Sequence, residues 1–156
     1  MAAKFTYVDE NVENKSEKRV RYFLVVMFFI QTVLTTFPFA QGSIDQGFTY
    51  YTALSLLIQP NGYGEEGDLM LVIVGAILVI TPMVAFFFCL LDKRSKKKYV
   101  ASALCSVLCA ITITFSIAGT ISIGAVLTLI INVITLFMTT QGVQATLRRE
   151  KTTDQV

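Results

Sequence analysis

Three uncharged polar side chains, Gln31, Thr81 and Asn132, lie deep inside long apolar stretches of the sequence. Counted at about 1.5 Å per helical residue, each lies near the middle of a membrane that its stretch would cross. Burying an amide without a hydrogen bond costs roughly 2–7 kcal/mol, so Gln31 and Asn132 must face a helix bundle or another subunit. Two interpretations remain open: hydrogen bonds that join helices, or the lining of an uncharged polar path.

The sequence assembles no catalytic set. It contains no His, and no Lys lies inside an apolar stretch, so a Ser or Thr nucleophile would lack a base. The acidic segment 64–68 matches no calcium-loop spacing. The three cysteines lie in apolar runs, where free Cys is a small packing residue; they are Cys89, Cys105 and Cys109. We therefore expect a protein that is not an enzyme and that uses no cofactor or metal.

The composition indicates that these residues lie in a membrane. Hydrophobic residues make up 54% of the 156 residues and charged residues 15%, against about 45–50% and about 25% in soluble domains. The mean hydropathy is +0.63. A chain of this length cannot enclose so much apolar surface in a water-soluble core.

The apolar stretches predict an all-α membrane protein, a four-transmembrane-helix bundle. Residues 69–91 are an uncharged run of membrane-spanning length, with Pro82 expected to kink it. Residues 99–142 would form a helix of about 66 Å, twice the thickness of a bilayer, and must fold back near 117–122. The predicted spans are residues 22–40, 69–91, 99–117 and 121–142.

The polar loop 41–68 contains an apolar segment, FTYYTALSLLI, at residues 48–58. A helix of this length measures about 16 Å and is too short to cross a membrane. Its aromatic start and leucine-rich end favour a short helix at the membrane interface. A re-entrant segment and an apolar cap over the bundle are the alternatives.

The basic residues fix the expected orientation. Of 13 Lys and Arg residues, five precede the first span, five lie in the link 92–98 and three follow the last span. The positive-inside rule then places the segment 1–21, the link and the tail 148–156 in the cytoplasm. The four spans and the segments that connect them form a membrane domain at 22–147. The basic link is interpreted as a topological anchor that attracts anionic lipid headgroups, and it offers no platform for nucleic acid; its residues are Lys93, Arg94, Lys96, Lys97 and Lys98.

The third predicted span carries small residues at the spacing that lets helices approach closely; they are Ser102, Ser106, Cys109 and Ala110. We expect this helix to be the most enclosed of the four. Gly75 and Gly124 indicate similar close approaches in the second and fourth spans.

No Asp, Glu, Lys, Arg or His lies inside a predicted span, whereas proton relays and ion-coupled transporters usually need such a group. The sequence therefore favours an accessory or scaffold subunit that binds another membrane protein or forms a homo-oligomer. A small transporter or channel subunit with an uncharged path is the alternative. The expected location is a bacterial cytoplasmic membrane.

Overall fold

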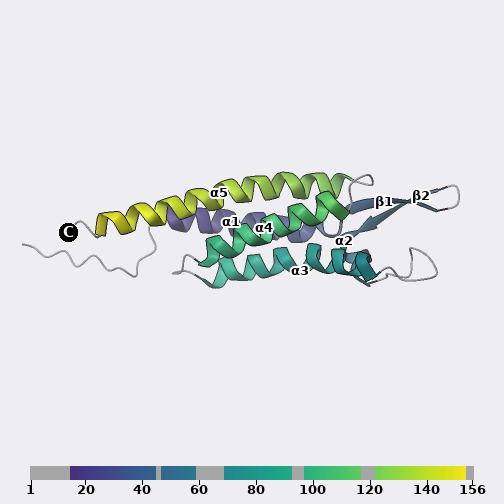
Figure 1. Ribbon diagram of the computed structural model, residues 1–156, viewed down its shortest axis with the longest axis horizontal. Helices are drawn as coiled ribbons and strands as arrows, with labels where there is room; N and C mark the ends of the chain where they lie inside the picture. Colours follow the sequence, from purple (N-terminus) through teal and green to yellow (C-terminus); the bar gives the residue numbers. More distant parts are fainter. Residues whose placement is uncertain (1–14, 45–46, 59–68, 93–96, 117–121, 154–156) are drawn as a thin grey trace, which may run out of the picture.

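The computed structural model describes residues 15–44, 47–58, 69–92, 97–116 and 122–153. Four long helices lie side by side, and a two-stranded hairpin extends from one end of the bundle (Figure 1). The expected helical fold is confirmed, with the hairpin as an addition. In chain order the elements are α1 (Lys15–Leu34), β1 (Pro38–Ile44), β2 (Gly47–Thr52), α2 (Ala53–Ile58), α3 (Leu69–Leu91), α4 (Lys97–Ser116) and α5 (Ile123–Thr153).

Among the described residues, three helices are long and apolar enough to cross a membrane: Leu69–Leu91, Lys97–Phe115 and Ile123–Leu147. These segments are compatible with an integral membrane protein. They correspond to the predicted second, third and fourth spans, the last two with shifted ends. Helix α1 does not meet the same condition because five charged residues lie in its first two turns, at Lys15, Glu17, Lys18, Arg19 and Arg21.

The predicted first span, 22–40, is wrong at its C-terminal end, because α1 ends at Leu34. At its other end α1 begins before the span, at Lys15. The hydroxyls of Thr35 and Thr36 donate to the carbonyls of Thr32 and Val33, at 2.7 and 2.8 Å, and close the last turn. Pro38 then lacks the N–H that a continuing helix needs. The chain leaves the helix and enters strand β1.

The predicted helix at 48–58 is also wrong over its first half, where the chain forms strand β2. Strands β1 and β2 pair antiparallel, from Pro38 opposite Thr52 to Ile44 opposite Gly47. Aromatic and β-branched residues such as those of FTYYT favour strands, and a partner strand overrode the helical interpretation.

Helix α2 covers only Ala53–Ile58. It starts with a reciprocal capping pair: the Ser55 amide donates to Thr52 Oγ1 and the Thr52 amide donates to Ser55 Oγ, both at 2.9 Å. This arrangement satisfies amides that the first turn of a helix leaves free.

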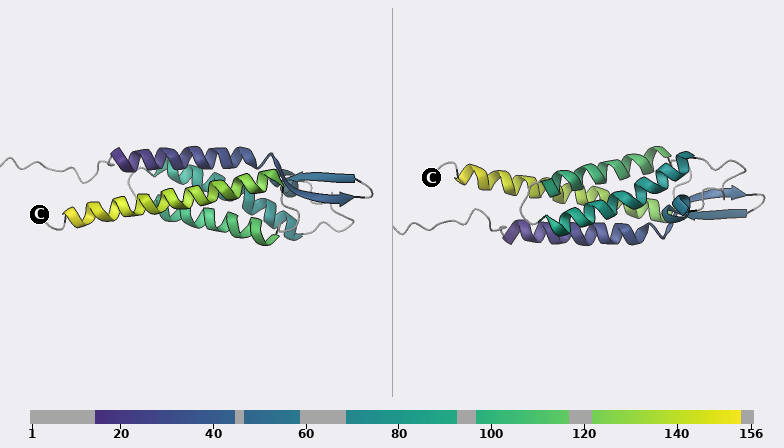
Figure 2. Two further views of the ribbon diagram at one scale, coloured as in Figure 1. Left: turned by 90° about the horizontal axis from the view of Figure 1, so that it is seen from above. Right: turned by 90° about the horizontal axis from the view of Figure 1, so that it is seen from below.

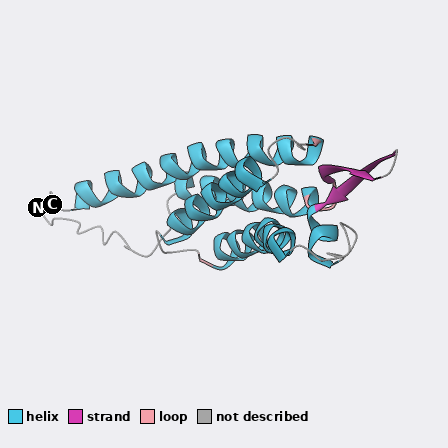
Figure 3. Cartoon of the chain, turned by 45° about the vertical axis from the view of Figure 1, so that its right-hand side comes forward, coloured by secondary structure: helices cyan, strands magenta, loops and turns pink. Residues whose placement is uncertain are grey.

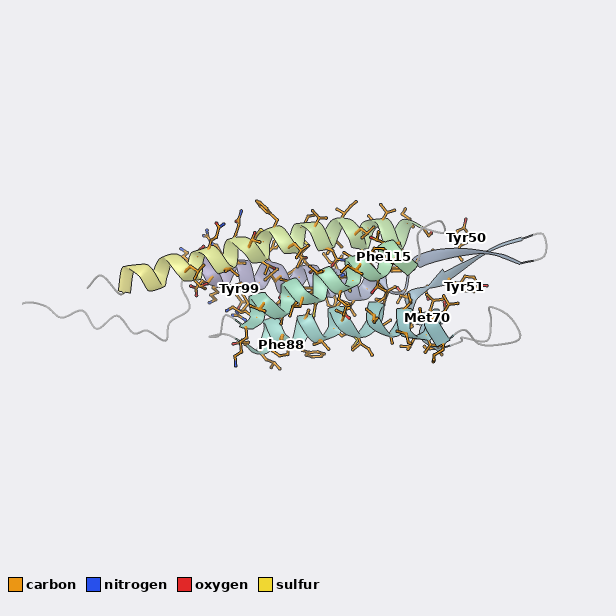
Figure 4. The ribbon with its side chains drawn as sticks, in the orientation of Figure 1. Tyr50, Tyr51, Met70, Phe88, Tyr99 and Phe115 are labelled. Carbon is orange, nitrogen blue, oxygen red and sulfur yellow. The ribbon has the colours of Figure 1, made fainter. Side chains whose placement is uncertain are left out.

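The four long helices run alternately up and down the bundle. Helix α1 begins and α5 ends at one end, which we call the charged end, and the hairpin and α2 lie at the other, the hairpin end (Figure 2). Most side chains on the outside of the bundle are apolar, whereas nitrogen-bearing side chains gather toward the charged end (Figure 4). On α5, for example, Val126, Ile130, Val133 and Phe137 are exposed.

The core contains two separate apolar clusters. The hairpin-side cluster joins the hairpin, α2 and the adjoining parts of α3, α4 and α5, with Phe39, Ala53, Val74, Leu78, Val79, Ile113 and Ala125. The charged-side cluster joins α1, α3 and α4, with Val20, Leu24, Phe28, Ala85, Cys89 and Tyr99.

Three glycines lie where another part of the chain approaches too closely for a side chain. A Cβ at Gly75 would lie 2.8 Å from the Leu57 amide of α2, and one at Gly124 would lie 2.5 Å from the Pro38 carbonyl. A Cβ at Gly142 would lie 2.5 Å from the Tyr99 ring. The close approaches expected at Gly75 and Gly124 are confirmed, although their partners are α2 and the start of β1, not another span.

Candidate functional site

A polar layer crosses the bundle between the two apolar clusters. Gln31 Nε2 of α1 donates a hydrogen bond of 3.0 Å to Asn132 Oδ1 of α5. The two side chains are 1% and 0% exposed. The structure therefore brings together two of the three polar residues that the sequence singled out, and places them inside the bundle.

The contact of Tyr99 with Gly142 fixes the levels of α4 and α5, which run in opposite directions (Figure 2). Ser106 of α4 and Thr135 of α5 each lie seven residues from this contact, which is about 10.5 Å along the helix axis, so the two residues are at the same level. Cys109 of α4 and Asn132 of α5 each lie ten residues from the same contact. Cys109 thus lies at the level of the Gln31–Asn132 pair.

Helix α3 reaches the same level through Thr81, whose side chain interacts with the Cys109 thiol. Thr81 precedes Pro82, which lies inside α3 and is buried. Proline has no N–H, so the Leu78 carbonyl does not receive its usual helical hydrogen bond. Each long helix therefore contributes one polar side chain to what we call the polar layer: Gln31, Thr81, Cys109 and Asn132.

Five polar atoms in or beside this layer are fully covered and have no hydrogen-bond partner among the described residues: Gln31 Oε1, Asn132 Nδ2, Ser106 Oγ, Thr128 Oγ1 and Thr135 Oγ1. Other hydroxyls of the bundle are bonded to their own helix. Thr112 and Thr139, for example, donate to the carbonyls four residues earlier, at 2.8 and 2.7 Å. The layer therefore has unused donors and acceptors, all of them uncharged.

The inward side of α5 is a continuous small and polar stripe, at alternating spacings of three and four residues: Ala125, Thr128, Asn132, Thr135, Thr139, Gly142 and Thr146. Large apolar side chains occupy the outward side. A soluble helix shows the opposite distribution. Sequence reasoning identified only Asn132 of this stripe, although the spacing of its threonines was a readable signal.

The small residues predicted to pack α4 lie on its inward side, where Ser102, Ser106 and Cys109 are buried and Ala110 is partly buried. Ser102 Oγ donates to the Lys98 carbonyl at 2.7 Å and lies 3.1 Å from Cys89 Sγ of α3.

The expectation that α4 is the most enclosed helix is wrong. In the most apolar stretch of each helix, α3 and α4 bury the same share of their residues, 39%. Helix α3 presents an equally compact inward side, with Gly75, Pro82, Ala85 and Cys89 buried, so neighbouring helices approach it as closely.

The predicted basic anchor is only partly described. Lys93, Arg94 and Lys96 lie outside the described residues, and Lys97 is exposed. Lys98 is only 2% exposed, and its Nζ lies 5.2 Å from the centre of the Tyr99 ring. Lys98 is therefore packed into the charged end and is not offered to lipid headgroups.

Sequence reasoning also missed buried charge at the charged end. Glu17 and Arg21 of α1 are buried together with Lys98. Arg21 lies 4.9 Å from the Tyr22 ring centre, and both Arg21 and Lys98 act electrostatically on the Cys89 thiol. Arg21 and Lys98 precede the predicted first and third spans by one residue and Glu17 precedes the first by five, which is why the spans themselves look uncharged.

Among the residues that the structure describes, no group of three His, Cys, Asp or Glu side chains could hold a metal ion. Comparison with protein-family models, with curated proteins and with solved structures gives no match for this chain. Function is therefore inferred from the polar layer and the hairpin.

Proposed function

We propose that this protein is a multi-pass membrane protein that acts as an accessory or scaffold subunit by binding other membrane proteins. In this proposal α1 also crosses the membrane, in addition to α3, α4 and α5, because Leu24, Phe28 and Gln31 bury its inward side in the bundle. Four spans place both termini and the basic link on one side. The positive-inside rule makes that side the cytoplasm, facing anionic headgroups.

The observation that carries this proposal is the hairpin, which extends past the ends of the helices (Figure 3). Its sheet has two strands, so each strand has one edge that no other described strand occupies. Such edges offer backbone donors and acceptors to an extended segment of another chain. The hairpin would meet its partner on the outer side of the membrane.

Photo-crosslinking tests this role. A photoreactive residue is placed at Tyr50 of β2, which is 58% exposed, and at Phe137 of α5, which is 62% exposed on the apolar side of the bundle. We expect a discrete protein adduct in intact cells from position 50 and none from position 137. The absence of an adduct at 50, together with a lone monomeric chain in mild detergent, would contradict the proposal. An adduct with a second copy indicates a homo-oligomer.

A second candidate function is a small transporter or channel subunit for uncharged solutes. The five unpartnered polar atoms of the core favour it, because a packed scaffold has no use for them. Flux of small neutral solutes into liposomes containing the protein tests it. We expect the double variant Gln31→Ala/Asn132→Ala to reduce the flux; equal flux in the parent and the variant would contradict this function.

A further inference from the structure

We infer that the polar layer is a central binding site for small uncharged molecules that both donate and accept hydrogen bonds, with water as the smallest. This inference rests on the same residues as the second candidate function. It goes further in naming the ligand chemistry, and it does not require that the molecule cross the membrane.

The amide pair supplies the recognition. Gln31 and Asn132 form one hydrogen bond with each other and leave the acceptor Gln31 Oε1 and the donor Asn132 Nδ2 without partners. Leaving a buried donor or acceptor unsatisfied costs about 1–3 kcal/mol. A molecule such as water, an alcohol or an amide carries both complementary groups and satisfies both atoms at once.

Three hydroxyls continue the site along the bundle. Ser106 and Thr135 lie about one turn from the amide pair toward the charged end, and Thr128 lies one turn toward the hairpin end. All three oxygens lack a partner among the described residues, and a hydroxyl can donate or accept as required. The site is uncharged, so a bound ion would have no compensating charge there.

The site is closed in this structure, because the five atoms are fully covered. Tyr99 against Gly142 closes the charged end, and Phe39 and Ile113 belong to the cluster that closes the hairpin end. The helices must part to admit a molecule. Pro82, where α3 lacks a backbone hydrogen bond, is the place where this helix bends most easily.

Cys109 provides a reporter at the level of the amide pair. A variant that keeps only this cysteine, through Cys89→Ala and Cys105→Ala, is reconstituted in liposomes and treated with the neutral reagent methyl methanethiolsulfonate. The matched control is a variant without native cysteines that carries Phe137→Cys on the outward side of α5. Thiol modification requires the thiolate, which forms only where water reaches the sulfur.

We expect Cys109 to react roughly tenfold faster than the cysteine at position 137. We also expect Gln31→Leu/Asn132→Leu to remove that advantage, and a sulfonate-bearing reagent of similar size to leave Cys109 unmodified. Labelling no faster than at position 137, labelling unaffected by the leucine pair, or equal labelling by the charged reagent would each overturn the inference. Labelling of Cys109 without solute flux supports the site and contradicts transport. Solute flux without labelling of Cys109 supports transport and contradicts the site.

Discussion

The middle of the bundle and its two ends are held together by different chemistry. Each end contains a cluster of large apolar side chains fitted against small ones, as Tyr99 fits against Gly142 and Phe39 lies beside Gly124. The middle contains a hydrogen bond between two amides, and several buried hydroxyls. Shape therefore specifies the packing of the ends, and hydrogen bonding specifies the middle.

The difference also shows how the bundle fits a membrane. Lipid is as apolar as the outward side chains, so apolar burial gives little preference for one helix arrangement over another. Close packing at the ends and a polar layer in the middle provide that preference. Substitutions at the ends should then act through side-chain volume, and substitutions in the middle through unpaired polar groups.

The largest effect is expected from emptying an end cluster. Phe28→Ala removes a buried ring from the charged-side cluster, and truncations of this kind cost about 3–5 kcal/mol of unfolding free energy. Reversible unfolding in mixed micelles measures this loss of unfolding free energy. Phe137→Ala on the exposed side of α5 is the control and should change stability by about 0.5 kcal/mol or less. Equal losses at the two positions would show that the inward side of α1 is misassigned.

Overpacking an end should have a smaller effect. Gly142→Ala places a Cβ against the buried Tyr99 ring, and such insertions cost about 1–3 kcal/mol. The neighbouring exposed position offers the control Gln141→Ala, for which a change within about 0.5 kcal/mol is expected. A neutral Gly142→Ala variant in the same unfolding assay would mean that α4 and α5 do not meet at this contact.

The smallest effect is expected at α2, outside the long helices. Thr52→Ala removes the hydroxyl that accepts from the Ser55 amide, and losing an N-cap costs about 1 kcal/mol. Hydrogen exchange should show faster exchange in α2 with little change in α3. Thr52→Ser keeps the hydroxyl and should exchange like the parent; if it exchanges as fast as Thr52→Ala, the cap does not hold α2.

Much of the helical framework could be predicted from hydropathy, because the runs at 69–91 and 99–142 are long and free of charge. The hairpin was not predicted, because FTYYTALSLLI as a whole fits a short interfacial helix, although its FTYYT half has the composition of a strand. Its first half becomes a strand only because residues 38–44 are available to pair with it. The partner strand is close in sequence, but the composition of residues 38–44 does not by itself predict a strand.

The sequence singled out Gln31, Thr81 and Asn132 of the site, the two amides most clearly. Gln31 and Asn132 stand out because an amide is costly in an apolar stretch, and a bundle offers few places to satisfy it. Thr128 and Thr135 did not stand out, and Ser106 did so only as a small packing residue, since a helical hydroxyl can always bond to its own backbone. Their lack of such a bond is a property of the packed structure.

A double-mutant cycle on Gln31 and Asn132 tests most directly whether a hydrogen bond joins α1 to α5 in the middle of the bundle. Unfolding free energies are measured in mixed micelles for the parent, Gln31→Leu, Asn132→Leu and the double variant. We predict that the double variant loses less stability than the sum of the single losses, by about 0.6 kcal/mol and up to about 1.7 kcal/mol. Strictly additive losses would contradict a direct contact between these two side chains.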